Sequence, residues 1–300
     1  MNILVTGGFG FIGSNLIDEL ILQNHKITST FYDNDIINKK VKILNKIENY
    51  DVCFHQAANN NTLDENKTKI FEVNFYDPIK LFNNLLEKGC KKFIYASSTA
   101  VYGNNKGPFK ETTQANPLNY YAESKLAFDE FAMDFANKNK VSAIGLRYCN
   151  VYGPKEHIKG KRSSMIFQLY DQIISKKNPK IFKYGEQKRD WCYVKDVVEA
   201  NISCLNYKDS GIFNIASGKS TSFSRIINLL NQLLNIKTTT TYVDCPFLDK
   251  YQNNTECDIT KAKMLLKWNP KYDIEKGIEE YVAWLQSNFN KNPLITPTPL

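Results

Sequence analysis

The sequence lacks the features that mark several protein classes. It has only three histidines, far apart, and its seven cysteines form no CxxC pair, so the spacing of a metal site is absent. No apolar run is long enough to span a bilayer, and the chain opens on a short apolar segment followed by glycines instead of a signal peptide. Neither an internal repeat nor a nucleic-acid-binding motif is present. With an odd number of cysteines, these absences predict a soluble, cytoplasmic protein without metal, membrane or nucleic-acid partners.

The composition is that of an ordinary globular protein, with 42% hydrophobic and 23% charged residues among 300. This length suffices for one large α/β domain with a smaller domain built onto it. The net charge of +8 suits anionic small molecules such as dinucleotides and sugar nucleotides, although a general preference for lysine explains it equally well.

In the first half, short apolar runs alternate with helical patterns, which predicts a parallel sheet with helices on its faces. The expected strands are 2–6, 26–31, 51–55, 92–97, 141–148 and, later, 212–216. The expected helices are 11–23, 36–48, 70–88, 118–137, 163–175, 194–207, 222–234, 259–266 and 274–286. The tail from 288 to 300, rich in proline, threonine and asparagine, is expected to be loose.

A glycine-rich turn joins the first strand to the first helix. Gly7, Gly10 and Gly13 follow a GxxGxxG spacing, which allows a tight turn and a close backbone approach to a pyrophosphate. The helix that follows offers free N–H groups and the positive end of its dipole to the phosphates. A glycine turn alone is weak evidence, but its place between a strand and a helix favours a nicotinamide dinucleotide site.

The choice between NAD and NADP stays open. An NAD-preferring site carries an acidic residue at the end of the second strand, where this chain has Phe31, Tyr32 and Asp33. No arginine stands ready for a 2′-phosphate, though Lys39 and Lys40 lie nearby.

Three residues form a candidate catalytic set. Tyr121 and Lys125 are four residues apart in a predicted helix, so their side chains share one face. We expect the lysine ammonium to lower the pKa of the tyrosine, which can then exchange a proton with a sugar hydroxyl. Ser98, at the end of a predicted strand, can bind the same substrate oxygen. His55, by contrast, is expected to be a buried histidine with a satisfied hydrogen bond.

Together these motifs resemble the extended short-chain dehydrogenase/reductase family. The motifs are the glycine turn, His-Gln-Ala-Ala at 55–58, Ser-Ser-x-x-Val-Tyr-Gly at 97–103, YxxxK, and the segments 147–154 and 189–196. The resemblance implies a doubly wound parallel Rossmann sheet with a smaller C-terminal α/β substrate domain, and an enzyme that modifies a nucleotide-diphosphate sugar. It also implies self-association.

The resemblance assigns further residues to the two ligands. Beside the three glycines, Tyr121 and Lys125, the residues implied to bind the cofactor are Phe11, Ile12, Ala57, Ala58 and Asn74. Asn150 and Arg189 are implied to lie near the substrate diphosphate, a role that suits the bidentate guanidinium. Ser98 is implied to contact the sugar.

Within this family the chain is most similar to ADP-L-glycero-D-manno-heptose 6-epimerases. The similarity covers roughly 115–287 and rests on segments 153–160, 187–190, 210–214, 251–252 and 258–260. It implies that Lys159 is a second acid/base and that Tyr251 binds substrate. A 4,6-dehydratase is disfavoured, because Thr99 and Ala100 replace the Asp-Glu pair which that reaction needs.

The chain also departs from these epimerases. The stretch before residue 51 is short, Lys161 to Ser163 is an insertion, and the asparagines at 59–61 replace a segment richer in hydroxyls. A heptose 6-epimerase working by transient oxidation is therefore the first hypothesis. An NAD(P)H-dependent reductase or a 4-epimerase of another nucleotide sugar is the second, and an inactive nucleotide-binding module is the third.

The expected domain organisation is discontinuous. Residues 1–153 with about 181–216 form the dinucleotide-binding domain, and about 154–180 with 217–287 form the substrate domain. The sugar is expected between them, beyond the carboxyl ends of the strands.

Overall fold

The computed structural model describes residues 1–30, 49–246 and 252–289. The strands are β1 (Asn2–Thr6), β2 (Lys26–Thr30), β3 (Val52–His55), β4 (Lys92–Ser98), β5 (Ser142–Tyr148), β6 (Val151–Tyr152), β7 (Lys180–Phe182), β8 (Lys188–Asp190), β9 (Cys192–Tyr193), β10 (Gly211–Ile215), β11 (Ser220–Ser222) and β12 (Thr241–Val243). The α-helices are α1 (Phe11–Leu22), α2 (Lys67–Phe71), α3 (Asp77–Glu87), α4 (Tyr120–Asn139), α5 (Met165–Ile174), α6 (Val194–Ser203), α7 (Phe223–Leu234), α8 (Thr260–Leu265) and α9 (Ile274–Phe289). A π-helix, η2 (Glu72–Tyr76), and two 3-10 helices, η3 (Thr99–Tyr102) and η4 (Glu156–Arg162), complete the set.

Six parallel strands form the central sheet, in the order β2-β1-β3-β4-β5-β10. Every residue of β3 and β5 is buried, as expected for strands covered on both faces. The strand order reverses direction between β1 and β3, whose pairing ends at Thr6 and His55. Ligands of open α/β sheets bind outside the carboxyl ends of the strands at such a switch point.

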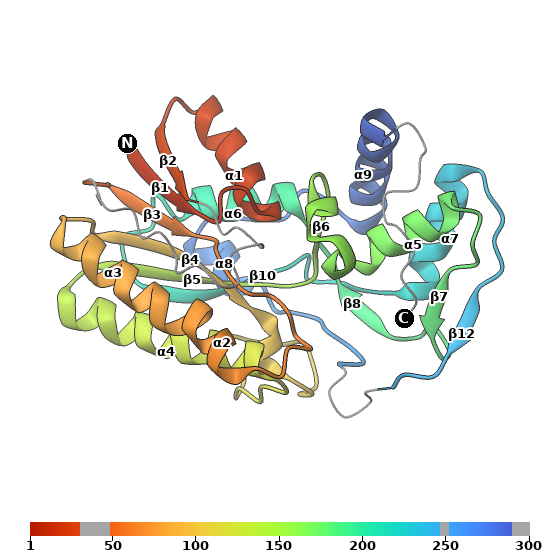
Figure 1. The fold of residues 1–300 in the computed structure, drawn as a ribbon, viewed down its shortest axis with the longest axis horizontal. Coiled ribbons are helices and arrows are strands. Elements are labelled where there is room, and N and C mark those ends of the chain that lie inside the picture. The colour runs from red at the N-terminus through yellow and green to blue at the C-terminus, as the bar shows by residue number, and fades with distance from the viewer. Residues whose placement is uncertain (31–48, 247–251, 290–300) are drawn as a thin grey trace.

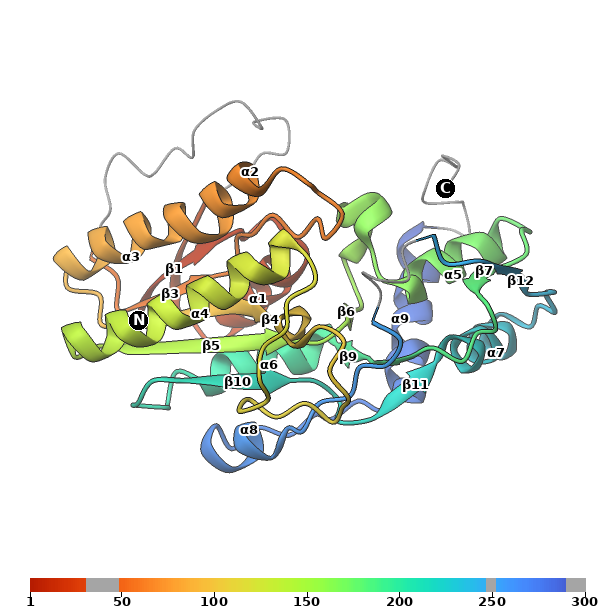
Figure 2. The same ribbon diagram turned by 90° about the horizontal axis from the view of Figure 1, so that it is seen from below.

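Helices cover both faces of this sheet. Figure 1 places α1 and α6 on one face and α2, α3 and α4 on the other, and Figure 2 shows α3 and α4 side by side on their face. The doubly wound Rossmann fold predicted from the sequence is thereby confirmed.

A second group of elements lies to one side of the sheet and contains α5, α7 and α9 with short two-stranded ribbons (Figure 1). Its helices share a separate hydrophobic cluster that also includes Ile181, Trp191 and Tyr193. The domain boundaries proposed from the sequence stay a prediction.

Most strands and helices lie where the periodicity places them, within two or three residues. The helix predicted at 70–88 begins earlier, because the Asn66 side chain accepts a hydrogen bond from the Lys69 N–H and so caps the helix. The π-helix η2 interrupts it. The helix predicted to reach 207 ends at Ser203, and α9 continues to Phe289, two residues into the predicted loose tail. The predicted helix 36–48, Phe31 to Asp33 and Tyr251 lie outside the described residues.

Within the described ranges every helix is too short or too polar to traverse a membrane. In the same ranges no cluster of three or more His, Cys, Asp or Glu side chains has the arrangement of a metal site.

Candidate active site

The glycine turn is packed so tightly that side chains are excluded. Gly7 has a positive φ of 67°, and a Cβ there would lie 2.7 Å from the main-chain nitrogen of Ala57. A Cβ on Gly13 would lie 2.2 Å from the carbonyl oxygen of Gly7. Gly10 is the N-cap of α1, and no side chain caps this end of the helix.

This turn fits a dinucleotide diphosphate. The first-turn N–H groups, at Phe11, Ile12 and Gly13, have no acceptor within an α-helix, and they lie at the positive end of the helix dipole. The glycines beside them carry no side chains. An anion can therefore approach closely enough to accept these hydrogen bonds.

The segment after β3 forms the other wall of this turn. Thr6 Oγ1 accepts a hydrogen bond from the Ala57 N–H at 3.3 Å and shares another with His55 Nδ1 at 2.7 Å. Burial lowers the pKa of His55 to about 3, with a further contribution from Lys125. The imidazole is therefore neutral. It is buried with a satisfied hydrogen bond, as the sequence predicted, and its partner Thr6 holds Ala57 beside the glycine turn.

Asn74 fastens this segment to the helix that carries the candidate catalytic residues. It lies in the π-helix and is 1% exposed. Its Oδ1 accepts from the Asn59 N–H at 2.8 Å, and its Nδ2 donates to the Asn59 carbonyl at 2.9 Å and to Ser124 Oγ at 3.1 Å. Protein groups thus engage both ends of the amide, and cofactor contact by Asn74 stays a prediction.

The structure brings Ser98, Tyr121 and Lys125 together at the carboxyl ends of the strands. Ser98 is the last residue of β4, and its hydroxyl is hydrogen-bonded to the side chain of Tyr121. Lys125 Nζ lies 6.0 Å from the centre of the Tyr121 ring and donates to the Ala96 carbonyl at 3.0 Å.

The electrostatics of this set correct one expectation. Burial raises the pKa of Tyr121, and the hydrogen bond from Ser98 opposes that rise. The predicted lowering by Lys125 was wrong, because the ammonium is directed to the Ala96 carbonyl and is itself desolvated. Burial lowers the pKa of Lys125 to about 8, against the opposing effect of Asp129.

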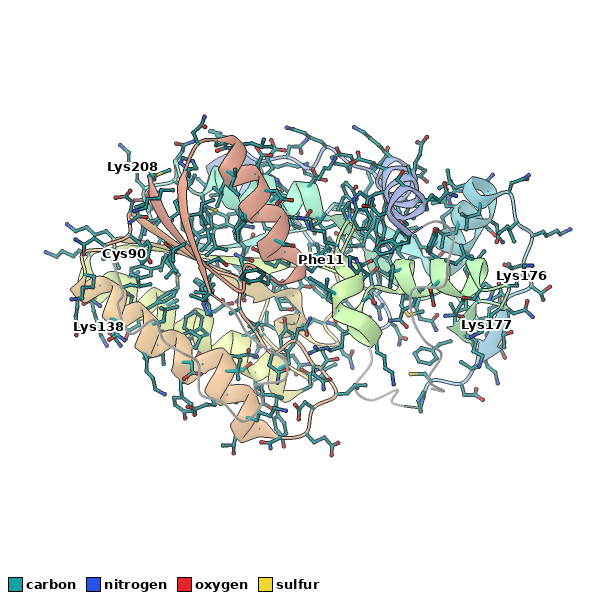
Figure 3. The ribbon with its side chains drawn as sticks, turned by 45° about the horizontal axis from the view of Figure 1, so that its top comes forward. Phe11, Cys90, Lys138, Lys176, Lys177 and Lys208 are labelled. Atoms are coloured by element: carbon teal, nitrogen blue, oxygen red, sulfur yellow. The ribbon has the colours of Figure 1, made fainter. Side chains whose placement is uncertain are left out.

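Lys159 lies on η4, beside the start of α1. Its ammonium is 5.4 Å from the centre of the Phe11 ring, so the loop reaches the first residue of α1. Asn15 Nδ2 donates to the Pro154 carbonyl at 3.0 Å, and Lys155 pairs with Asp18, which fastens the loop to that helix. Figure 3 labels Phe11 at the start of α1, next to the coil of η4.

The surroundings of Lys159 favour a reactive amine. Burial lowers its pKa, which the buried carboxylate of Glu156 opposes and Arg162 reinforces. Arg162 also donates to Asn60 Oδ1 at 3.1 Å and thereby joins η4 to the segment after β3. Sequence reasoning singled out both segments as unusual for the epimerases, but it gave no signal that they meet.

Asn150 and Arg189 lie at the edge between the two groups of elements. Asn150 has a positive φ of 37°, and its Nδ2 donates to the Asp190 carbonyl at 3.2 Å and to Thr255 Oγ1 at 3.0 Å. Arg189 is 8% exposed, and its guanidinium lies 5.6 Å from the centre of the Phe223 ring. Their contact with a diphosphate stays a prediction.

Comparison with known proteins identifies the family of this chain. Residues 3–216 match the model of the NAD dependent epimerase/dehydratase family. The chain belongs to this family. A nicotinamide dinucleotide cofactor, named as NAD by the family description, and an enzyme of the epimerase class are thus confirmed.

Several solved structures share the fold over almost the whole chain. The ADP-L-glycero-D-manno-heptose-6-epimerase of Helicobacter pylori is 32% identical, with a TM-score of 0.85 over 95% of this chain and 96% of that one. The UDP-glucose 4-epimerase of Thermotoga maritima, solved with UDP-glucose, is 27% identical, with a TM-score of 0.85 over 96% and 99%. The UDP-N-acetylglucosamine 4-epimerase of Methanobrevibacter ruminantium M1, solved with UDP-N-acetylmuramic acid, is 28% identical, with a TM-score of 0.86 over 96% and 99%.

Proposed function

We propose that the protein is an ADP-glycero-manno-heptose 6-epimerase, which inverts the C6 carbinol by transient oxidation and re-reduction. The observation that carries this proposal is the presence of two lysines, Lys125 beside Tyr121 and Lys159 beside Phe11 at the start of α1. The 32% identity to the Helicobacter pylori enzyme over nearly the whole chain supports the same choice.

The side chains divide the work by their placement. Bound NAD supplies the hydride acceptor and donor. Tyr121 takes the proton of the substrate hydroxyl, while Ser98 holds the same oxygen through a hydrogen bond. Lys125 orients the nicotinamide ribose and supplies a positive charge.

Inversion needs the intermediate to receive hydride on the face opposite the one that lost it. A second proton donor and acceptor then serves the alternative orientation of the sugar. Lys159 fills that role, because burial lowers the pKa of its amine and so makes its proton easier to release. Asn150 and Arg189 bind the diphosphate, and Tyr251 binds the substrate. The sugar lies between the dinucleotide-binding part and the part formed by about 154–180 and 217–287.

A second candidate is a 4-epimerase of a UDP-linked sugar. It is favoured by the two 4-epimerase structures that match equally well in fold at 27% and 28% identity. A reductase differs from both epimerases in consuming NAD(P)H with each turnover.

The test is incubation of the purified protein with ADP-D-glycero-D-manno-heptose, without added cofactor, followed by proton NMR of the sugar and absorbance of the nicotinamide band. We expect the L-glycero epimer to appear while the absorbance stays flat. A panel of UDP-sugars run in parallel tests the 4-epimerase, and keto-sugar nucleotides with NADPH test the reductase.

Two variants separate the proposed proton carriers. Tyr121→Phe is expected to lower turnover about 10²-fold or more, and Lys159→Met about tenfold or more, as for loss of a general acid/base. Lys161→Met is the matched control, since Lys161 is an exposed lysine two residues along the same loop. Equal losses in Lys159→Met and Lys161→Met would contradict a specific role for Lys159.

A further inference from the structure

A buried carboxylate lies one helical turn beyond Lys125. Asp129 is 1% exposed and Lys125 3% exposed, and the spacing of four residues on α4 puts both side chains on the face that also carries Tyr121. A charged side chain is rarely this deeply buried without a partner, because desolvation disfavours its ionised form.

Arg147 of β5 pairs with this carboxylate and favours its charged form. Its Nε donates to Asp129 Oδ2 at 2.9 Å, and both side chains are almost fully buried. The guanidinium in turn donates to the Tyr102 hydroxyl at 2.9 Å, and that hydroxyl donates to Asn214 Oδ1 at 2.7 Å. The partner of the carboxylate is therefore itself fixed, through Tyr102 of η3 and Asn214 of β10.

The pair with Arg147 leaves part of the carboxylate uncompensated. Its Oδ1 makes no hydrogen bond of good geometry within the described residues. Burial raises the pKa of this carboxyl, and Arg147 with the Ser97 and Tyr95 hydroxyls opposes that rise. The negative charge can thus act on Lys125, whose ammonium donates to the Ala96 carbonyl.

The other ionisable groups on the elements packed here do not supply a negative charge. His55 of β3 is neutral, and burial raises the pKa of Tyr95 on β4 and of Tyr121 on α4. Arg147 is positive and is occupied by Asp129. Asp129 is the group that opposes the effect of burial on the Lys125 ammonium.

We propose that Asp129 is a positioning residue, whose buried negative charge keeps the Lys125 ammonium charged and held beside Tyr121, at the Ala96 carbonyl. Its importance for turnover rests on the proposed function. Its effect on Lys125 does not, because it follows from the packing of α4 on the sheet.

The decisive experiment is an NMR pH titration of protein labelled with carbon-13 at the lysine Cε, without substrate. The Lys125 signal is identified by its loss in Lys125→Met. We expect a midpoint near pH 8 in the unaltered protein, a lower midpoint in Asp129→Asn, and a midpoint restored toward 8 in Asp129→Glu. Asp134→Asn is the matched control, because Asp134 is exposed on the same helix and pairs with Lys138 at 2.6 Å; its midpoint should not move.

Asp129→Asn leaves Arg147 buried without its counter-ion and can unfold the protein. A double variant, Asp129→Asn with Arg147→Gln, removes both charges together and keeps polar groups at both positions. It should also titrate at lower pH than the unaltered protein. An unchanged midpoint in either folded variant would overturn the proposal.

Turnover provides a second, separable readout. In Asp129→Asn the alkaline limb of the rate profile should move to lower pH, and each unit of displacement costs about tenfold in rate on the alkaline side. A lowered midpoint without turnover of any sugar would reject the proposed function and leave the role of Asp129 intact. Normal turnover with an unmoved midpoint would reject the role of Asp129 and leave the proposed function intact.

Discussion

One added methyl group at Gly13 tests the dinucleotide turn most directly. A Cβ there would lie 2.2 Å from the Gly7 carbonyl oxygen, 2.8 Å from the Gly7 carbonyl carbon and 2.9 Å from the Gly8 Cα. All three are backbone atoms, so no side chain can rotate out of the way. Ordinary van der Waals contact begins at 3.4 Å, so the start of α1 must move by about 1.2 Å from the turn.

Such a movement breaks the cradle before it unfolds the protein. The Gly10 N–H donates to the Gly7 carbonyl at 2.9 Å, and this bond sets the direction of the first N–H groups of α1. Overpacking of a dense site costs about 1–3 kcal/mol of stability. Misdirection of two or three charge-assisted hydrogen bonds to a diphosphate costs about 1.5–3 kcal/mol each, so NAD affinity should fall at least about 10²-fold.

The assay is titration calorimetry of NAD binding with urea unfolding of the same samples. Gly10→Ala is the graded comparison, since its Cβ would lie 3.0 Å from the same oxygen and its φ of −77° accepts alanine. We expect Gly13→Ala to lose more affinity than Gly10→Ala. If Gly13→Ala binds NAD as the unaltered protein does, the cradle does not bind the diphosphate and the reasoning is refuted.

Three further outcomes are expected. Ser98→Ala removes the hydrogen bond that lowers the pKa of Tyr121, so that pKa should rise. In a profile of rate against pH, the rate should fall about tenfold or more, and the limb of the profile that reports Tyr121 should move to higher pH. His55 has a pKa of about 3 in the folded protein against 6.5 in the unfolded chain, so the stability that it contributes is present above pH 6.5 and is lost as pH falls toward 3. Urea unfolding at several pH values should show a loss of order 4 kcal/mol in the free energy of unfolding, and His55→Asn should reduce that loss. Lys92 Nζ donates to three main-chain carbonyls after α6, at 3.2, 2.6 and 2.7 Å. Lys92→Met should therefore lower the free energy of unfolding by about 1–3 kcal/mol and leave NAD affinity unchanged. A loss of NAD affinity would contradict a purely structural role for Lys92.

Local patterns account for what the sequence predicted well. Apolar runs such as Ile3 to Val5 and helical periodicity depend on neighbours along the chain, and they located the parallel strands and the long helices. The short strands β6 to β9, β11 and β12 were not predicted, because strands of two or three residues are defined by their pairing partners and have no sequence pattern of their own. The π-helix around Asn74 could not be predicted for a related reason: it accommodates hydrogen bonds from Asn74 to Asn59 and Ser124, which are remote in the sequence.

The sequence by itself determined the chemistry available to this protein: the glycine spacing, the tyrosine and lysine one helical turn apart, and the serine at the end of a strand. The tertiary structure decided which groups meet and how they are charged. It brings Lys159 to Phe11, pairs Asp129 with Arg147, and raises the pKa of Tyr121 where the sequence had predicted a lower one. The physical reason is that burial and distance between remote residues set protonation, and both arise only when the sheet and its helices have packed.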